Sequence, residues 1–454
     1  MLNGKATQYL LGLGIFSLYF FLGYSIQRHE TALLLGLYGI VFLVYAWIIF
    51  KAPNDQLTYW TYAAIACRLI LLFSVPNLSE DFYRFIWDGR LIASGYHPFA
   101  HIPSFYIENK ISIAGIDESL YQNLNSKNYF TVYPPVAQFL FWLSAKISHH
   151  VYGSLLFLKT LNVFAEIVSI FLLRRLISHF KIPQRNLLVY ALNPLVILEL
   201  SGNAHFEAIM IVFLLASIYF IARERLPLAA ITLAIAICTK LIPLIFLPAI
   251  LTLLGWKKAV QLYAITGLTC IVLFIPLLDV AIIEGFQHSL GYYFSRFEFN
   301  ASIYYLVRWL GFLFFGYNIV HIAGGVLGVI ATFLIIKISI RTDKSRSQQT
   351  VDLKSDTVFK ISTFIESLLW ALMVYFLFTT TLHPWYVTTL LAISVLTRYK
   401  FVVLWSFTIF LSYAGYSRDG FNENLWIVAF EYITVLGYLG YELLWKKRFS
   451  LSIA

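Results

Sequence analysis

The stretch from Ser79 to Pro98, SEDFYRFIWDGRLIASGYHP, is an acidic and aromatic segment that follows the third long apolar run of the chain. Ser79 stands at a helix cap position and acidic residues fill the first turn, whereas Gly95 and Pro98 are residues that end helices. The segment therefore predicts a helix from Glu80 to Ser94 that places carboxylates at the polar edge of a membrane.

Three charged residues share one face of this predicted helix. Asp81, Arg84 and Asp88 follow one another at i, i+3 and i+7. A carboxylate at the lip of a membrane cavity can accept a proton from a hydroxyl group that attacks a sugar. The alternative is that Glu80, the two aspartates and the arginines at 84 and 90 form a solvated salt-bridge lattice that keeps the loop folded.

Composition excludes a water-soluble domain, because 60% of the residues are hydrophobic, 18% are aromatic and only 12% are charged. Apolar stretches long enough to cross a bilayer recur from Tyr9 to Leu444. They are continuously apolar, which favours helices over the alternating strands of a membrane barrel. We expect an all-α polytopic membrane protein with about 12 to 14 transmembrane helices, each of roughly 20 residues.

The net charge of +10 does not indicate nucleic-acid binding, because the basic residues form short clusters between apolar runs. Such clusters mark the cytoplasmic side of a membrane protein. We therefore expect both termini inside and one integral-membrane domain over residues 1–454, with a first outer loop at 77–153 and a second at 279–317. The runs Val136 to Ile147 and Ser302 to Gly316 are predicted to lie along the outer surface as interfacial helices.

No Gly-rich phosphate-binding loop and no separate soluble domain is recognisable in the sequence. A nucleotide-activated donor normally requires such a loop. An activated substrate is therefore expected to arrive from within the bilayer.

Several polar motifs fall at or near the predicted outer ends of apolar runs. Ionisable residues in such positions usually face a cavity or a charged partner. Each could equally be a satisfied structural polar group. The motifs are Asn193-Pro194, Ser201 to Glu207 (SGNAHFE), Thr239-Lys240 and His383 to Tyr386 (HPWY), and the ionisable candidates within or beside them are Glu166, Glu199, His205, Glu207, Lys240 and His383.

Taken in order, these residues resemble the integral-membrane glycosyltransferases of the GT-C fold class, especially the polyprenol-phosphate-mannose-dependent mannosyltransferases. The elements EDFYR, WDGR and GYHPF, followed by Tyr133-Pro134-Pro135, look like the first outer loop of that group. Bacterial α-mannosyltransferases and the catalytic subunit of GPI mannosyltransferase I show related patterns. Where the bacterial members would have a His-x-Asp-like element, this chain has His205-Phe206-Glu207.

The resemblance implies transfer of a monosaccharide, expected to be mannose, from a polyprenyl-phosphate donor to an acceptor hydroxyl at the outer membrane face, with inversion at the anomeric carbon. Asp81 is expected to be the catalytic base, with Glu80 as its neighbour and first substitute. The residues expected to bind the donor phosphate or substrate are Arg84, Asp88, Arg90, His205, Glu207, Lys240, Arg296, Arg308, His383, Trp385 and Tyr386.

The expected partners are the lipid-linked donor, a glycan or glycolipid acceptor and membrane lipids, with no nucleic acid. No cofactor is required and no metal ligand is assigned, although Mg²⁺ or Mn²⁺ held by Glu80, Asp81, Asp88 and His383 is an open alternative. The expected location is a bacterial plasma membrane with the site facing the periplasm or exterior, or the endoplasmic reticulum in a eukaryote.

Two other functions also require a lipid-linked substrate. A transporter or flippase of a lipid-linked sugar is expected to show inverted halves or paired broken helices. An oligosaccharide polymerase or ligase usually has its working loop late in the chain, whereas the long acidic loop here is early. A purely structural membrane subunit is the remaining alternative.

Overall fold

The computed structural model describes residues 4–279, 285, 297–344 and 353–444, and most of these residues are helical. The described part of the chain contains one two-stranded antiparallel sheet, formed by β1 (Tyr416–Ser417) and β2 (Gly420–Phe421). The expectation of an all-α polytopic membrane protein is confirmed.

The elements before the middle of the chain are α1 (Gly4–Tyr24), α2 (Thr31–Lys51), η1 (Asn54–Gln56), α3 (Leu57–Leu71), α4 (Asp81–Ala93), α5 (Pro103–Glu108), α6 (Glu118–Gln122), α7 (Pro135–Ile147), α8 (Val151–His179), η2 (Gln184–Asn186), α9 (Leu187–Ala191), α10 (Pro194–Val196), the π-helix η3 (Ile197–Gly202) and α11 (Glu207–Ala222). Those that follow are α12 (Leu226–Thr239), η4 (Ile242–Phe246), α13 (Leu247–Phe274), η5 (Ile275–Leu277), α15 (Ile303–Phe315), α16 (Val320–Lys344), α17 (Leu353–Phe378), η6 (Pro384–Tyr386), α18 (Val387–Ser394), α19 (Phe401–Thr408), η7 (Ile409–Gly415) and α20 (Leu425–Leu444).

Among the described residues, seven helical segments are long and apolar enough to cross a membrane, or eight if a bent pair counts as one span. The bent pair is Pro194–Gly202 with Glu207–Ala222, and the helix axis bends by 115° between the two parts. This number is lower than the 12 to 14 crossings expected from the apolar runs. The difference arises because several apolar runs fold as short or broken helices, such as α12 and α19, so an apolar run does not always form one continuous span.

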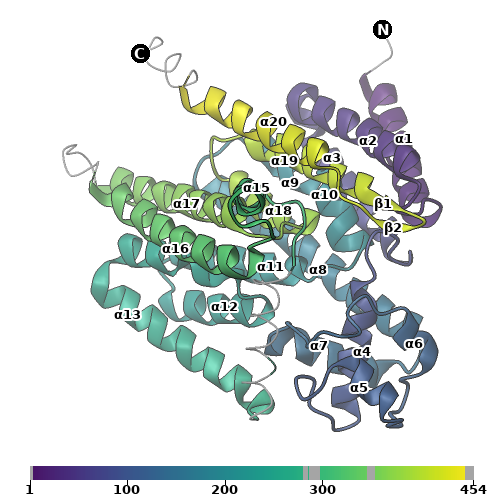
Figure 1. Ribbon diagram of the computed structural model, residues 1–454. Helices are drawn as coiled ribbons and strands as arrows, with labels where there is room; N and C mark the ends of the chain where they lie inside the picture. The colour runs from purple at the N-terminus through teal and green to yellow at the C-terminus, as the bar shows by residue number, and fades with distance from the viewer. Residues whose placement is uncertain (1–3, 280–284, 286–296, 345–352, 445–454) are drawn as a thin grey trace.

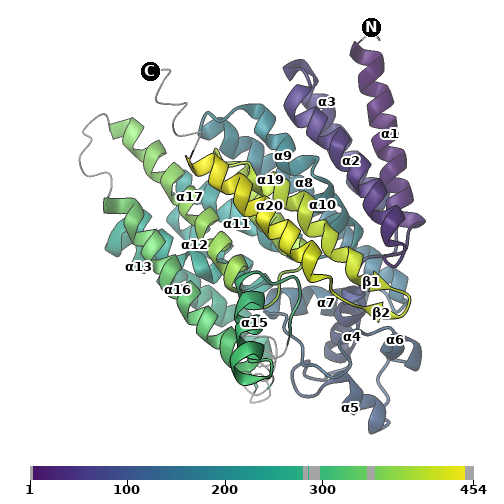
Figure 2. The same ribbon diagram turned by 45° about the horizontal axis from the view of Figure 1, so that its top comes forward.

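The helices from the acidic stretch onward, α4 to α7, form a group at the end of the molecule opposite both chain termini (Figure 1). Figure 2 places this group in the same position relative to the long helices, with α20 and α19 crossing the middle of the molecule. The expected outer loop at 77–153 thus coincides with a compact helical substructure. Its orientation relative to a membrane stays a prediction.

Helix α4 packs closely against α7, and a glycine permits this approach. A Cβ atom at Gly89 would overlap the backbone carbonyl of Phe141. The ring of Phe85 stacks on that of Phe141 at 4.8 Å and meets Phe206 edge-on at 5.2 Å. This packing joins the acidic helix to the beginning of α11, so that residues from both elements can form one site.

Candidate functional site

Asp81 is the first residue of α4, one position later than the predicted helix start. Its Oδ1 accepts a hydrogen bond of 2.7 Å from Asn125 Nδ2, and its side chain is 24% exposed. The backbone N–H of Leu78 donates to Asn203 Oδ1 at 3.1 Å, which ties the segment before α4 to the end of the π-helix η3. The Asp81 side chain is therefore held in place by a hydrogen bond, and its carboxylate remains partly accessible to a substrate.

The loop after η3 directs His205 toward this carboxylate. Ala204 has a φ of +62°, a conformation that costs energy for any residue except glycine and that recurs at functional sites. The backbone carbonyl of His205 accepts a hydrogen bond from Asn162 Nδ2 at 3.2 Å. His205 Nδ1 lies 4.0 Å from Asp81 Oδ2. A π-helix followed by a strained residue thus positions the imidazole beside the predicted base.

Glu199, on η3, lies on the other side of the same imidazole. His205 Nε2 is 3.3 Å from Glu199 Oε2, and Tyr413 Oη donates a hydrogen bond of 2.7 Å to Glu199 Oε1. Both glutamate and histidine are buried. The sequence marked Glu199 only as an ionisable residue in an apolar run. Its partner Tyr413 carries no sequence signal.

The HPWY motif closes the site from a third direction. The Trp385 ring lies between two imidazoles, with its centroid 3.7 Å from that of His205 and 4.4 Å from that of His383, and both pairs are nearly parallel. Burial, with a smaller contribution from the charge of Lys240, lowers the pKa of His383 to about 3. His383 is therefore neutral at physiological pH and serves as an aromatic wall.

Lys240 ends α12 and pairs with Glu207, the first residue of α11. Its Nζ also lies 4.5 Å from the centre of the Tyr386 ring, within cation–π range. The lysine side chain is 23% exposed although Glu207 is buried. The helix dipole favours a cation at a helix C-terminus. The Lys240 ammonium group remains partly accessible and can bind an anionic group.

Burial raises the pKa of the Asp81 carboxyl above its ordinary value. The hydrogen bond from Asn125 and the charge of Lys240 lower this pKa, whereas the charges of Glu207 and Glu80 raise it. The balance leaves the pKa raised. A carboxylate with a raised pKa is a stronger base and is better matched to proton transfer near neutral pH.

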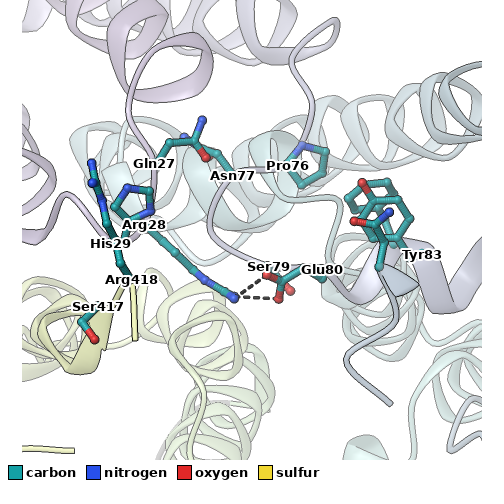
Figure 3. Close-up of a pocket in the computed structure, with 12 residues that line it drawn as sticks. Gln27, Arg28, His29, Pro76, Asn77, Ser79, Glu80, Tyr83, Ser417 and Arg418 are labelled. Atoms are coloured by element: carbon teal, nitrogen blue, oxygen red, sulfur yellow. Dashed lines mark hydrogen bonds and ion pairs between the residues drawn. The ribbon is translucent and has the colours of Figure 1, made fainter. Parts of the chain in front are cut away.

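Glu80, the residue beside Asp81, faces a different partner. Arg28, between α1 and α2, donates a hydrogen bond of 2.6 Å from Nη1 to Glu80 Oε2, and its guanidinium lies 4.5 Å from the Tyr416 ring centre. Figure 3 shows the two dashed contacts between these side chains. No motif in the sequence indicates Arg28, which lies in a short connection between two apolar runs.

Arg84, Asp88 and Arg90 make contacts that hold α4 in place. Arg84 Nε donates to Asp88 Oδ1 at 2.8 Å and Arg84 Nη1 donates to the Tyr129 carbonyl at 2.8 Å. Arg90 Nη2 donates to the carbonyl of His149 at 2.8 Å. The three side chains are buried, so these contacts form a buried network rather than the solvated lattice of the alternative, and they do not bring the three residues to the His205 cluster.

The second expected outer loop reaches the site through Phe299. Its backbone forms a parallel bridge with Thr381, and its ring lies 4.6 Å from that of His383. Arg308, on α15, pairs with Glu298 at 2.5 Å and lies 4.3 Å from the Tyr305 ring centre. Arg296 lies outside the described residues.

Within the described part of the chain, no three His, Cys, Asp or Glu side chains converge to hold a metal ion. The four residues considered as metal ligands are separated by their own partners. Glu80 pairs with Arg28, Asp81 accepts a hydrogen bond from Asn125, Asp88 pairs with Arg84, and His383 stacks on Trp385.

Comparison of the sequence with known proteins identifies a family. The chain is similar to α-(1→6)-mannopyranosyltransferase A of Mycobacterium tuberculosis, with 27% identity over 179 residues. The match covers 39% of this chain and 33% of that protein, so it spans about a third of the relative's length. The family model for the N-terminal domain of α-(1→6)-mannopyranosyltransferases matches residues 17–256, more than half of the chain, and includes α4, η3 and Lys240. The chain therefore belongs to the α-(1→6)-mannopyranosyltransferase family.

Proposed function

We propose that this chain is an inverting GT-C glycosyltransferase that moves mannose from a polyprenyl-phosphate donor to an acceptor hydroxyl, with Asp81 as the base. The observation that carries the proposal is the Asp81 carboxyl itself. It is partly exposed, has a raised pKa and borders His205, within a chain whose family is named for mannosyl transfer. Buried ionisable groups arranged in this way are typical of active sites.

In the proposed step, the acceptor oxygen attacks the anomeric carbon while its proton passes to Asp81. The bond between the anomeric carbon and the phosphate oxygen breaks, and its electron pair leaves with the polyprenyl phosphate. Lys240, with its reachable ammonium group, is placed to stabilise the charge on this phosphate. His205 and Glu199 hold the geometry beside Asp81.

Helix α15 supports delivery of the donor from the bilayer. It has 13 residues, fewer than the roughly 20 that a crossing requires. Large apolar side chains on it remain exposed, among them Trp309 and Phe314. We infer that α15 and α7 lie at the outer surface of a bacterial plasma membrane, where an isoprenoid chain can contact α15.

The choice of donor tests this proposal. Purified protein is supplied with radiolabelled polyprenyl-phosphate mannose or with GDP-mannose, together with an α-(1→6)-linked mannoside acceptor. The proposal predicts transfer from the lipid donor and none from the nucleotide donor. Transfer from GDP-mannose alone would overturn it, and movement of the intact lipid donor across a vesicle membrane without transfer would favour a flippase.

The pH dependence gives a prediction about Asp81 and Lys240. Asp81 must be ionised to accept a proton, so kcat/KM falls as the pH drops through its raised pKa. Lys240→Met removes a charge that lowers this pKa, so the acid limb of the kcat/KM profile is expected to move to higher pH. Lys240→Arg, which keeps the charge, is the matched control. An acid limb at the same pH in all three proteins would contradict the assignment.

A further inference from the structure

A polar pocket lies immediately beside the Asp81 site, on the side of Glu80. Its volume is about 560 Å³, within the range of roughly 300–1,000 Å³ that ligand sites occupy. Four parts of the chain line it: the α1–α2 connection, the residues leading into α4 with the first turn of that helix, Asn123 after α6, and the β1–β2 hairpin. Figure 3 labels residues from the first, second and fourth of these. Its lining includes Gln27, Arg28, His29, Ser79, Glu80 and Arg418.

The lining offers both donors and an acceptor to a ligand. Arg28 and Glu80 pair with each other in the pocket wall, and Figure 3 shows Arg418 beside His29 on the opposite side. Among the described residues, Gln27, His29 and Arg418 have no side-chain hydrogen bond or ion pair. Polar groups that converge on a pocket without partners of their own can be satisfied by a ligand rich in hydroxyl groups.

Two elements run from the pocket to the proposed base. Glu80 lines the pocket, and the next residue, Asp81, faces His205. Asn123 lines the pocket, and Asn125, two residues later, donates its hydrogen bond to Asp81. Asp81 is not part of the pocket lining, so a molecule held in the pocket must extend past Glu80 to present a hydroxyl group to Asp81, while the donor phosphate occupies the Lys240 side.

We propose that this pocket is the acceptor subsite and that it binds the sugar residues of a neutral mannoside, an assignment that rests on the proposed function. The Glu80 carboxylate accepts hydrogen bonds from sugar hydroxyls, and its pairing with Arg28 leaves that part of the wall close to neutral. Arg418, at the free side, determines acceptor affinity.

The test is a binding titration with α-(1→6)-mannotriose, followed by saturation-transfer NMR, on the full-length protein in phospholipid nanodiscs. Arg418→Ala is expected to weaken trisaccharide binding at least tenfold and to raise the acceptor KM, with little change in the donor KM. Arg398→Ala is the matched control, because Arg398 is also exposed and does not line the pocket. It is expected to bind the trisaccharide as the wild type does.

Three results would overturn the assignment: no trisaccharide binding to the wild type, binding within twofold of wild type in both Arg418→Ala and Arg28→Ala, or displacement of the trisaccharide by inorganic phosphate. Hydrolysis of polyprenyl-phosphate mannose in the absence of acceptor tests the proposed reaction independently of the pocket. If the donor is hydrolysed but the pocket variants bind the trisaccharide as the wild type does, only the pocket assignment is rejected. If trisaccharide binding depends on the pocket residues but the donor is neither hydrolysed nor used for transfer, the proposed reaction is rejected and the sugar site remains.

Discussion

Replacing Asp81 by asparagine is expected to lower kcat for mannosyl transfer by about a thousandfold, within the range for loss of a general base. Asparagine has the same shape, and its carbonyl can still accept the hydrogen bond from Asn125, but it cannot accept a proton. The loss should therefore appear in kcat, with donor affinity preserved. Initial rates with polyprenyl-phosphate mannose and direct binding of the donor in the same detergent measure the two effects separately.

Two variants control this experiment. Asp55→Asn makes the same chemical change at an exposed position in η1 and should transfer mannose at the wild-type rate. Glu80→Gln removes the neighbouring carboxylate, which is held by Arg28, and should reduce the rate much less than Asp81→Asn. If Glu80→Gln were inactive and Asp81→Asn active, the roles of the two carboxylates would be exchanged.

The second large effect concerns stability. Arg68 and Glu166 form a fully buried ion pair at 2.9 Å between α3 and α8. Arg68 Nη1 also donates to the Ala191 carbonyl at 2.7 Å, and Tyr190 Oη donates to Glu166. Glu166→Ala leaves the guanidinium buried without its counterion, which typically costs about 3–5 kcal/mol. The free energy of unfolding in mild detergent should fall by that amount.

The double variant Arg68→Met/Glu166→Leu separates charge from packing. It removes both charges and retains apolar volume, so it should recover most of the stability that Glu166→Ala loses. A double variant less stable than Glu166→Ala would mean that the hydrogen bond from Arg68 to Ala191, rather than the buried pair, carries the stabilisation.

Local sequence signals predicted the elements that carry the site. The capping and stop residues around the acidic stretch predicted a helix from Glu80 to Ser94, and α4 runs from Asp81 to Ala93. The apolar run from Val136 to Ile147 predicted a helix, and α7 runs from Pro135 to Ile147. The motifs at His205, Lys240 and Trp385 were selected separately, and the structure brings them together through ring stacking and the Lys240–Tyr386 contact.

The contacts that could not be predicted join residues far apart in the chain. Arg28 and Glu80 are separated by 52 positions, and Glu199 and Tyr413 by 214. Helix periodicity relates residues only within a few turns, so it cannot pair such side chains. Hydropathy has a related limit, since it cannot distinguish a continuous span from an apolar run that is broken, as by the π-helix and the 115° bend between α10 and α11.

The anomeric configuration of the product tests the central claim most directly. Wild-type protein is given β-linked polyprenyl-phosphate mannose and an α-(1→6)-mannobioside, and the new linkage is read by NMR. A single direct displacement assisted by Asp81 predicts an α-linked product, with inversion. A β-linked product would require retention and a covalent or second-displacement step, and donor binding with no new linkage at all would contradict the transferase assignment.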